Sequence, residues 1–149
     1  MKQSITLSGR LHATITDART GVVVDERHVD NLVTLVGRNQ VRDLLITGTG
    51  PTLSHYAVGT GTTPAVAGDT SLQNEVFRDV ATQIVELPGE VEVTLYLSST
   101  QANGNDITEA GIFTADLGGA MFARTVFSPI NKTSNVAITF AHTISIGAS

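Results

Sequence analysis

The sequence predicts a mainly β protein: an antiparallel β-sandwich, jelly-roll-like, with one inserted α-helix. Three observations favour this fold class. Apolar and polar residues alternate over long stretches, which is the period of a half-buried strand. Turn-forming residues separate these stretches at regular spacing. Thr, Val, Ile and Gly are abundant, whereas charged residues make up 15% of the chain. Because 149 residues are the size of one domain, we expect residues 1–149 to form a single sandwich.

The first element is a predicted hairpin. Apolar and polar residues alternate from Ile5 to Thr16, and turn residues follow between Asp17 and Gly21. Valines then restart the alternation. We therefore expect residues 3–17 to pair with residues 22–29. The extended segment 1–8 could also act as an N-terminal arm that adds a strand to a neighbouring subunit.

The next element is the one predicted helix. Apolar residues between Thr34 and Ile46 recur near helical spacing, with Thr34 as a candidate N-cap and Gly48 as a candidate stop. Gly37 lies inside this segment and costs about 1 kcal/mol relative to Ala. We expect the helix to span residues 34–46 and to cover one open side of the sheet.

A long glycine-rich and threonine-rich loop follows the short predicted strand 53–58. At its end, residues 72–78 are expected to form a brief helical turn capped by Asp69 or Thr70. Alternation and turn signals predict the remaining strands at residues 80–86, 91–97, 107–115, 121–127 and 136–146. With the hairpin and residues 53–58, this gives about eight strands.

Composition argues against several classes of function. The formal net charge of −5 and the isoelectric point of about 5.2 disfavour a nucleic-acid partner. No run approaches the ~20 apolar residues of a membrane helix, and the N-terminus lacks an apolar signal core. The chain has no Cys, so it has no disulfide or thiolate site. We expect folding in a cytoplasm, with no membrane partner.

Motifs for catalysis or for cofactor binding are missing from the sequence. The loop Gly59–Pro64 has neither the spacing nor the lysine of a phosphate-binding loop. No nucleophile elbow occurs, and His12, His28, His55 and His142 lack metal-site spacing. His28, flanked by acidic residues, could bind a metal weakly, although a solvated charged turn explains it better. We expect no catalytic residue, cofactor or metal, and His142 is predicted to be a core or interface histidine.

Four charged residues lie within or beside apolar segments: Glu75, Arg78, Glu109 and Arg124. A charge held among apolar neighbours needs a partner, because an isolated buried charge costs several kcal/mol. We therefore predict a structural ion pair in which Glu109 contacts Arg78 or Arg124 and fixes strand register. The alternative is that all four are ordinary surface charges.

A series of short motifs runs through residues 31–146. In order they are Asn31–Leu45 with Gly37 inside, Tyr56–Gly61, Leu72–Arg78, Glu109–Phe113 and Phe122–Ile130. Taken together they resemble the small structural proteins of tailed bacteriophage virions, which include tail-fibre, collar and baseplate-associated proteins and related β modules that decorate capsids. The resemblance implies a non-enzymatic virion subunit, a homo-oligomer with a trimer favoured, and other virion proteins as partners.

Within that family the resemblance favours a tail-associated role as an adaptor, collar, baseplate or fibre-anchoring component. A fibre would continue into a long repetitive shaft or a receptor-binding tip, so we do not expect a complete receptor-binding fibre. A capsid decoration or cement protein on the head exterior is the alternative. The neutral loop of Gly59, Thr60, Gly61, Thr62, Thr63 and Pro64 is a candidate subunit contact. A carbohydrate-binding module that recognises a host-surface glycan is a rival, although the chain has no Trp and two Tyr for a sugar platform.

Overall fold

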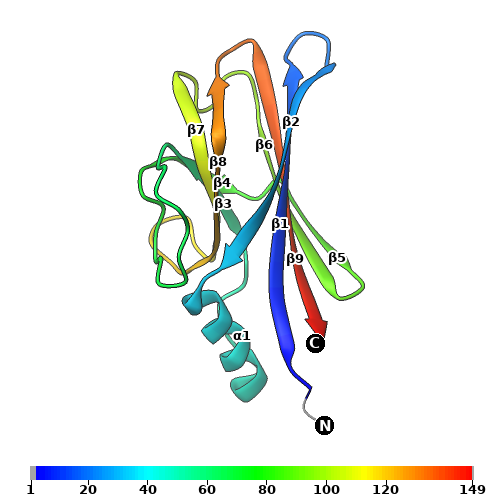
Figure 1. Ribbon diagram of the computed structural model, residues 1–149, viewed down its shortest axis with the longest axis vertical. Helices are drawn as coiled ribbons and strands as arrows, with labels where there is room; N and C mark the ends of the chain where they lie inside the picture. The colour runs from blue at the N-terminus through cyan, green and yellow to red at the C-terminus, as the bar shows by residue number, and fades with distance from the viewer. Residues whose placement is uncertain (1–2, 149) are drawn as a thin grey trace.

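Nine antiparallel strands and one helix make up the protein, as seen in a computed structural model that describes residues 3–148 (Figure 1). The mainly β prediction with one inserted helix is confirmed. In chain order the elements are β1 (Ile5–Asp17), β2 (Val23–Val33), α1 (Leu35–Thr47), β3 (His55–Gly59), β4 (Glu75–Val80), β5 (Gln83–Leu87), β6 (Glu90–Leu97), β7 (Asn105–Phe113), β8 (Met121–Lys132) and β9 (Val136–Ala148).

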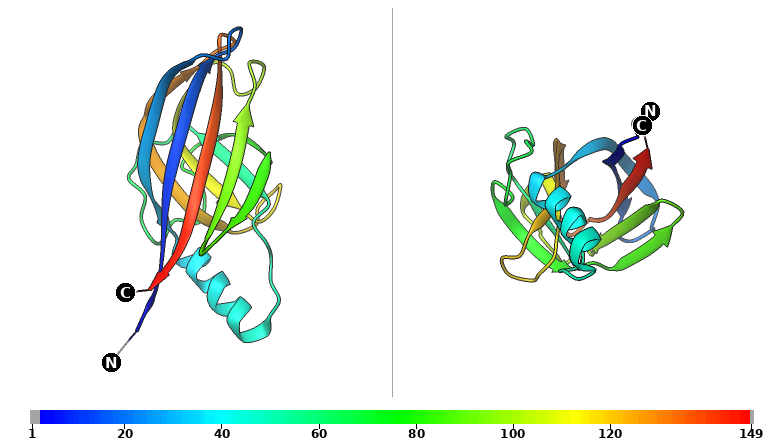
Figure 2. Two further views of the ribbon diagram at one scale, coloured as in Figure 1. Left: turned by 90° about the vertical axis from the view of Figure 1, so that its right-hand side faces the viewer. Right: turned by 90° about the horizontal axis from the view of Figure 1, so that it is seen from below.

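All nine strands belong to one hydrogen-bonded sheet of order β4-β3-β7-β8-β2-β1-β9-β6-β5. β2 joins the two halves of this sheet. Most of β2 pairs with β1, but its last two residues, Leu32 and Val33, pair with Arg124 and Ala123 of β8. The sheet curls at this point, so that its halves face each other across the interior (Figure 2). The pairing therefore gives one curled sheet, and the two-layered sandwich stays a prediction.

Residues from both halves fill the core, and in β1 the alternation read from the sequence places them there. In β1, Leu11, Ala13 and Ile15 are buried while the residues between them are partly exposed. β9 runs beside β1 in the register Ala13↔Phe140. From the other half, Tyr56 of β3 stacks against Phe140 with ring centroids 5.8 Å apart. Burial alternates along β1, whereas most successive residues of β3 and β7 are buried, and this apolar burial is the main stabilisation of the curl.

α1 has the caps that the sequence predicted. The Thr34 hydroxyl accepts a hydrogen bond from the Gly37 amide, and Gly48 ends the helix with φ 67°. However, the expectation that the helix covers one open side of the sheet is wrong. Gly37 is its one buried residue, and the helix projects from the end of the curled sheet near the two termini (Figure 1). α1 is not long and apolar enough to span a membrane, and the described residues contain no other helix.

Residues 72–78 do not form the expected helical turn. The chain bends at residues 71–74 and then enters β4, which pairs with β3 at one edge of the sheet. The reason is that the amides of Gln73 and Asn74 donate to the Glu109 carboxylate. β4 is thus the ninth strand, which the sequence analysis missed.

The segment 1–8 is not a free arm over the part that the structure describes. Ile5 to Ser8 pair with Ala148 to Ser145 of β9, so these residues continue the sheet of their own chain. Residues 1–2 lie outside the described residues. The pairing of β1 with β2 begins at Gly9. Ile5–Ser8, which precede it, therefore pair with β9 on one side and with no described strand on the other.

Candidate interaction site

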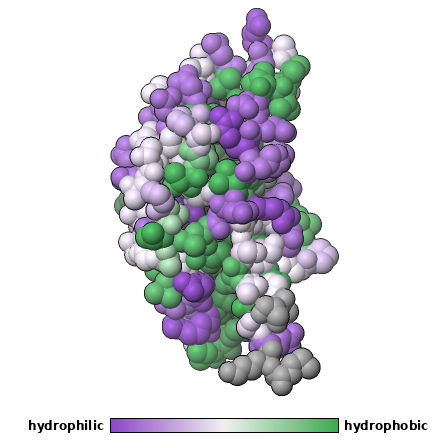
Figure 3. Space-filling view, viewed as in Figure 1, coloured by the Kyte–Doolittle hydropathy of each residue, from purple (hydrophilic) through white to green (hydrophobic). Residues whose placement is uncertain are grey.

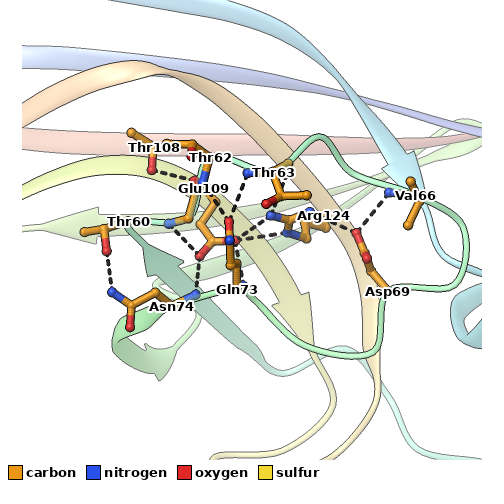
Figure 4. Close-up of polar contacts among 11 residues, drawn as sticks. Thr60, Thr62, Thr63, Val66, Asp69, Gln73, Asn74, Thr108, Glu109 and Arg124 are labelled. Atoms are coloured by element: carbon orange, nitrogen blue, oxygen red, sulfur yellow. Dashed lines mark hydrogen bonds and ion pairs between the residues drawn. The ribbon is translucent and has the colours of Figure 1, made fainter.

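Glu109 is the centre of a buried polar network between β7 and the loop that joins β3 to β4 (Figure 4). Its side chain has no exposed area. Oε1 accepts from the backbone amides of Gly61 at 3.0 Å and Asn74 at 2.8 Å. Oε2 accepts from the Gln73 amide at 3.0 Å and from Arg124 Nε at 3.0 Å. Four donors match the acceptor capacity of a carboxylate, so the group is fully satisfied.

Arg124 of β8 connects the same carboxylate to a more distant part of the loop. The side chain is 2% exposed. Besides Glu109, it donates from Nη1 to Asp69 Oδ2 at 2.9 Å and from Nη2 to the Thr63 carbonyl at 2.9 Å. Asp69 also accepts from the Val66 amide. One cation therefore lies between two carboxylates, and this pairing offsets the cost of burying the charges of Arg124 and Glu109.

The two glycines of Gly59–Gly61 are explained by the close approach of this carboxylate. A Cβ built on Gly59 would lie 2.5 Å from Glu109 Oε1, and one on Gly61 would also lie 2.5 Å from it. Backbone and side-chain atoms of Asn74 and Gln73 approach equally closely. The motif that looks like a phosphate cradle is therefore filled by a carboxylate of the protein itself.

Glu75 and Arg78 form a separate ion pair on β4. Arg78 donates to Glu75 from Nε at 3.0 Å and from Nη2 at 2.6 Å, which is a bidentate contact. Its Nη1 donates to the carbonyls of Ala115 and Gly118, and its guanidinium lies 3.7 Å from the centre of the Phe113 ring. Arg78 thus attaches the edge strand to the turn between β7 and β8.

The four predicted charges are accordingly placed in two groups. Glu109 contacts Arg124, one of the two partners that the sequence analysis offered, and Arg78 contacts Glu75 instead. The candidate contact loop is divided as well: Gly59 and Gly61 are buried, Thr60 is partly buried, and Thr62, Thr63 and Pro64 are exposed. The amides of Thr62 and Thr63 donate to the Gln73 side chain, so the exposed part is held in one conformation.

His142 is a core residue that connects the two halves of the curled sheet. Its Nδ1 lies 3.0 Å from the hydroxyl of Tyr56 on β3, while the Nε2 atom is buried without a hydrogen-bond partner. Burial lowers the pKa of His142 to about 3 and raises the pKa of Tyr56. The imidazole is therefore neutral across the physiological range.

Lys132 is a buried cation that the sequence analysis missed. Its Nζ donates to the Asn103 side chain at 2.6 Å and to the Thr133 carbonyl at 3.1 Å. Burial lowers the pKa of Lys132. Its position two residues after the buried Ile130 is the signal that could have placed it on the inner face.

His12 meets Glu26 and His28 on the outer face of β1 and β2, although His12 is distant from the other two in sequence. Their candidate ligand atoms all lie within 4.8 Å of one another. The sequence analysis found no metal-site spacing because it considered short intervals along the chain. A bulge between Ile15 and Thr16 shifts the hairpin register by one residue, so counting outward from the predicted turn at residues 17–21 would not have brought His12 opposite His28.

The lower end of the molecule carries an apolar surface made by α1, β5 and β9. Figure 3 shows hydrophobic side chains at this end. We define the apolar end surface by its exposed side chains, which are Leu44, Leu45, Ile46, Ile84 and Ile146. Leu45 and Ile46 are 78% and 75% exposed. A groove of about 340 Å³ runs along this surface between α1 and the sheet, and Leu7, Val41 and Leu53 contribute to its walls.

Comparisons with known proteins identify no relative of this chain. No protein-family model matches it, and no curated protein and no solved structure is significantly similar to it.

Proposed function

We propose that the protein is a non-enzymatic structural subunit of a tailed bacteriophage virion, associated with the tail as an adaptor, collar, baseplate or fibre-anchoring component. It assembles in the host cytoplasm and resides in the virion. The residues of the motif series support this role. Gly59, Gly61, Glu109 and Arg124 come together to position a loop, and their polar atoms are used in doing so. Side chains used in this way have a structural role.

The observation that carries the proposal is the exposure of α1. Of its 13 residues one is buried, whereas helices of globular proteins pack an apolar face against a core. The chain exposes 7931 Å², while a monomer of 15.6 kDa is expected to expose about 7,250 Å². The excess of about 700 Å² is close to one partner's share of a standard interface.

A second copy of the same chain is the occupant that we propose for the apolar end surface. The unpaired edge of Ile5–Ser8 lies on the same projecting end as β9 and its Ile146, so a neighbour can add main-chain hydrogen bonds to the apolar contact. The assembly is a homo-oligomer, with a trimer favoured. We also propose that the facing halves of the curled sheet act as the layers of a jelly-roll-like sandwich.

The mass of the purified chain by light scattering tests this proposal. We expect a stable oligomer, and we expect the double variant Leu45→Asp/Ile46→Asp to be a monomer. Leu117→Asp is the matched control, because Leu117 is 91% exposed but lies in the turn between β7 and β8, outside the apolar end surface. A wild-type monomer would contradict the proposed interface.

Sedimentation with purified phage particles decides the location. Binding to isolated tails and not to tail-less capsids is the expected result. Binding to tail-less capsids would favour the decoration or cement role instead. Binding to host-surface glycan by a chain that ignores both particles would favour the carbohydrate-binding module, which the exposed Tyr96 would serve.

A further inference from the structure

We propose that His12, Glu26 and His28 form a binding site for a divalent transition metal of the zinc class. The site lies on the outer face of the curled sheet, on neighbouring strands of the first hairpin. It is independent of the buried network around Glu109 and of the apolar end surface.

The register of the hairpin assembles the three side chains. His12 of β1 lies directly opposite His28 of β2, and Glu26 precedes His28 by two residues, so it points to the same face. The two imidazole rings are stacked with centroids 4.2 Å apart and an angle of 17° between their planes. A one-residue change of register would move His12 away from both partners.

The separations between ligand atoms approach those of tetrahedral coordination. Zinc bonds of about 2.0–2.2 Å in a tetrahedron hold ligand atoms about 3.4 Å apart. His12 Nε2 lies 3.3 Å from Glu26 Oε1, and His28 Nε2 lies 3.9 Å from Glu26 Oε2. The three ligand atoms lie within 4.8 Å of one another, and rotation of the exposed rings out of their stacked arrangement would bring them to one ion. Two imidazoles and one carboxylate leave the fourth position to water.

The surroundings leave room for the ion, and no side chain among the residues that the structure describes places a free cation against it. A depression of about 400 Å³ lies beside His12 and His28, where the small Ala141 of β9 forms part of the wall. Arg10, also at this depression, lies 3.5 Å from Glu90. Arg27 alternates to the opposite face of β2 and contacts Asp25.

The ligand set also selects among metals. Two neutral imidazoles favour Zn²⁺, and by the same chemistry Ni²⁺ and Cu²⁺, whereas Mg²⁺ and Ca²⁺ prefer oxygen ligands throughout. Binding would bridge β1 and β2 and so stabilise this hairpin. Its two strands also pair with β9 and β8, respectively. At free zinc a hundred times the dissociation constant, the expected rise in melting temperature is about 5–10 °C.

Titration calorimetry with ZnCl₂ on the full chain, with each histidine replaced in turn, tests the site. We expect one Zn²⁺ per chain, and we expect His12→Gln and His28→Gln each to weaken binding more than about tenfold, a loss seen even for residues that only orient ligands. His55→Gln is the matched control and should bind as the wild type does. MgCl₂ and CaCl₂ should give no saturable heat.

Two further measurements distinguish loss of metal binding from loss of folding. The variants substitute partly exposed side chains, so their metal-free melting curves should match the wild type. Co²⁺ should give the visible absorption bands of a tetrahedral site in the wild type and lose them in Glu26→Gln. Zinc binding that is unchanged in His12→Gln and His28→Gln, or no saturable binding by the wild type, would overturn the proposal.

Discussion

At the scale of single residues, Glu109 connects several separate segments of the chain through its carboxylate. Its carboxylate holds the amides of Gly61, Gln73 and Asn74 and the guanidinium of Arg124. These donors come from three separate segments of the chain. Removing the negative charge would therefore weaken the attachment of the β3–β4 loop to both β7 and β8.

Glu109→Gln should lower the free energy of unfolding by about 3–5 kcal/mol, because breaking one partner of a buried pair leaves the other uncompensated. The NH₂ group of the glutamine would also face backbone N–H donors whose hydrogen bonds the carboxylate now accepts. Urea denaturation measures the change. Glu75→Gln is the control: this carboxylate is 34% exposed, and its replacement should cost about 1 kcal/mol or less. Equal losses in the two variants would contradict the central role of Glu109.

His142 gives the protein a dependence on acid that follows from its position. Because burial lowers its pKa to about 3, the folded chain keeps the imidazole neutral where the unfolded chain, with an ordinary pKa of 6.5, binds a proton. The unfolded state therefore binds more protons between these values. Stability from this group is complete above about pH 6.5 and is lost as the pH falls towards 3.

We expect the free energy of unfolding to fall by roughly 2–3 kcal/mol from this group between pH 7 and pH 4.5. His142→Leu should remove that part of the slope, as measured by denaturation at a series of pH values. Tyr56→Phe removes the hydrogen-bond partner but leaves the buried imidazole, so it should keep the slope. A His142→Leu variant as acid-sensitive as the wild type would refute the assignment.

At the scale of elements, α1 shows how a contact can outweigh a helix propensity. Gly37 lies in the first turn of the helix where it meets β8, and a Cβ there would lie 2.4 Å from the Phe122 carbonyl oxygen. This approach holds the otherwise exposed helix against the sheet. The Thr34 hydroxyl adds a second attachment by donating to the Met121 carbonyl at 2.6 Å.

Gly37→Ala therefore decides between two opposite expectations. Helix propensity alone predicts a gain of about 1 kcal/mol, whereas the clash with a backbone atom predicts a loss of about 1–3 kcal/mol. We expect the loss, measured by denaturant unfolding. Arg38→Ala, at the next and exposed position, should change stability by less than about 0.5 kcal/mol. A more stable Gly37→Ala variant would show that α1 can move away from β8.

At the scale of the whole molecule, the curl through β2 makes two half-sheets share one core. Tyr56 belongs to the half that contains β3, and Tyr96 belongs to β6 in the other half. Since the inner residues of each half pack against the other, neither half buries its apolar face alone. This interdependence is the physical basis for treating residues 3–148 as one domain.

Unfolding should accordingly be a single transition in both halves. Tyr96→Phe leaves Tyr56 as the one tyrosine, and Tyr56→Phe leaves Tyr96, so each variant reports on one half. In each variant the tyrosine fluorescence and the far-ultraviolet circular dichroism should give the same denaturant midpoint. Different midpoints within one variant would mean that the halves unfold separately.

The sequence alone determined most of the local structure. Alternation and turn signals located eight of the nine strands, and Thr34 and Gly48 located both ends of α1, because strand period, turns and helix caps depend on residues near one another in the chain. It also selected Glu109 and Arg124, since charges among apolar neighbours need partners.

Tertiary structure decided the features that depend on which distant groups meet. Residues 72–78 were predicted to form a helical turn, but the Glu109 carboxylate accepts hydrogen bonds from the amides of Gln73 and Asn74, and the chain continues into β4. The same holds for Arg124 as the partner of Glu109, for the crossing of β2 between two half-sheets, and for His12 facing His28. Such pairings follow from the long-range register of the strands, and local patterns do not encode that register.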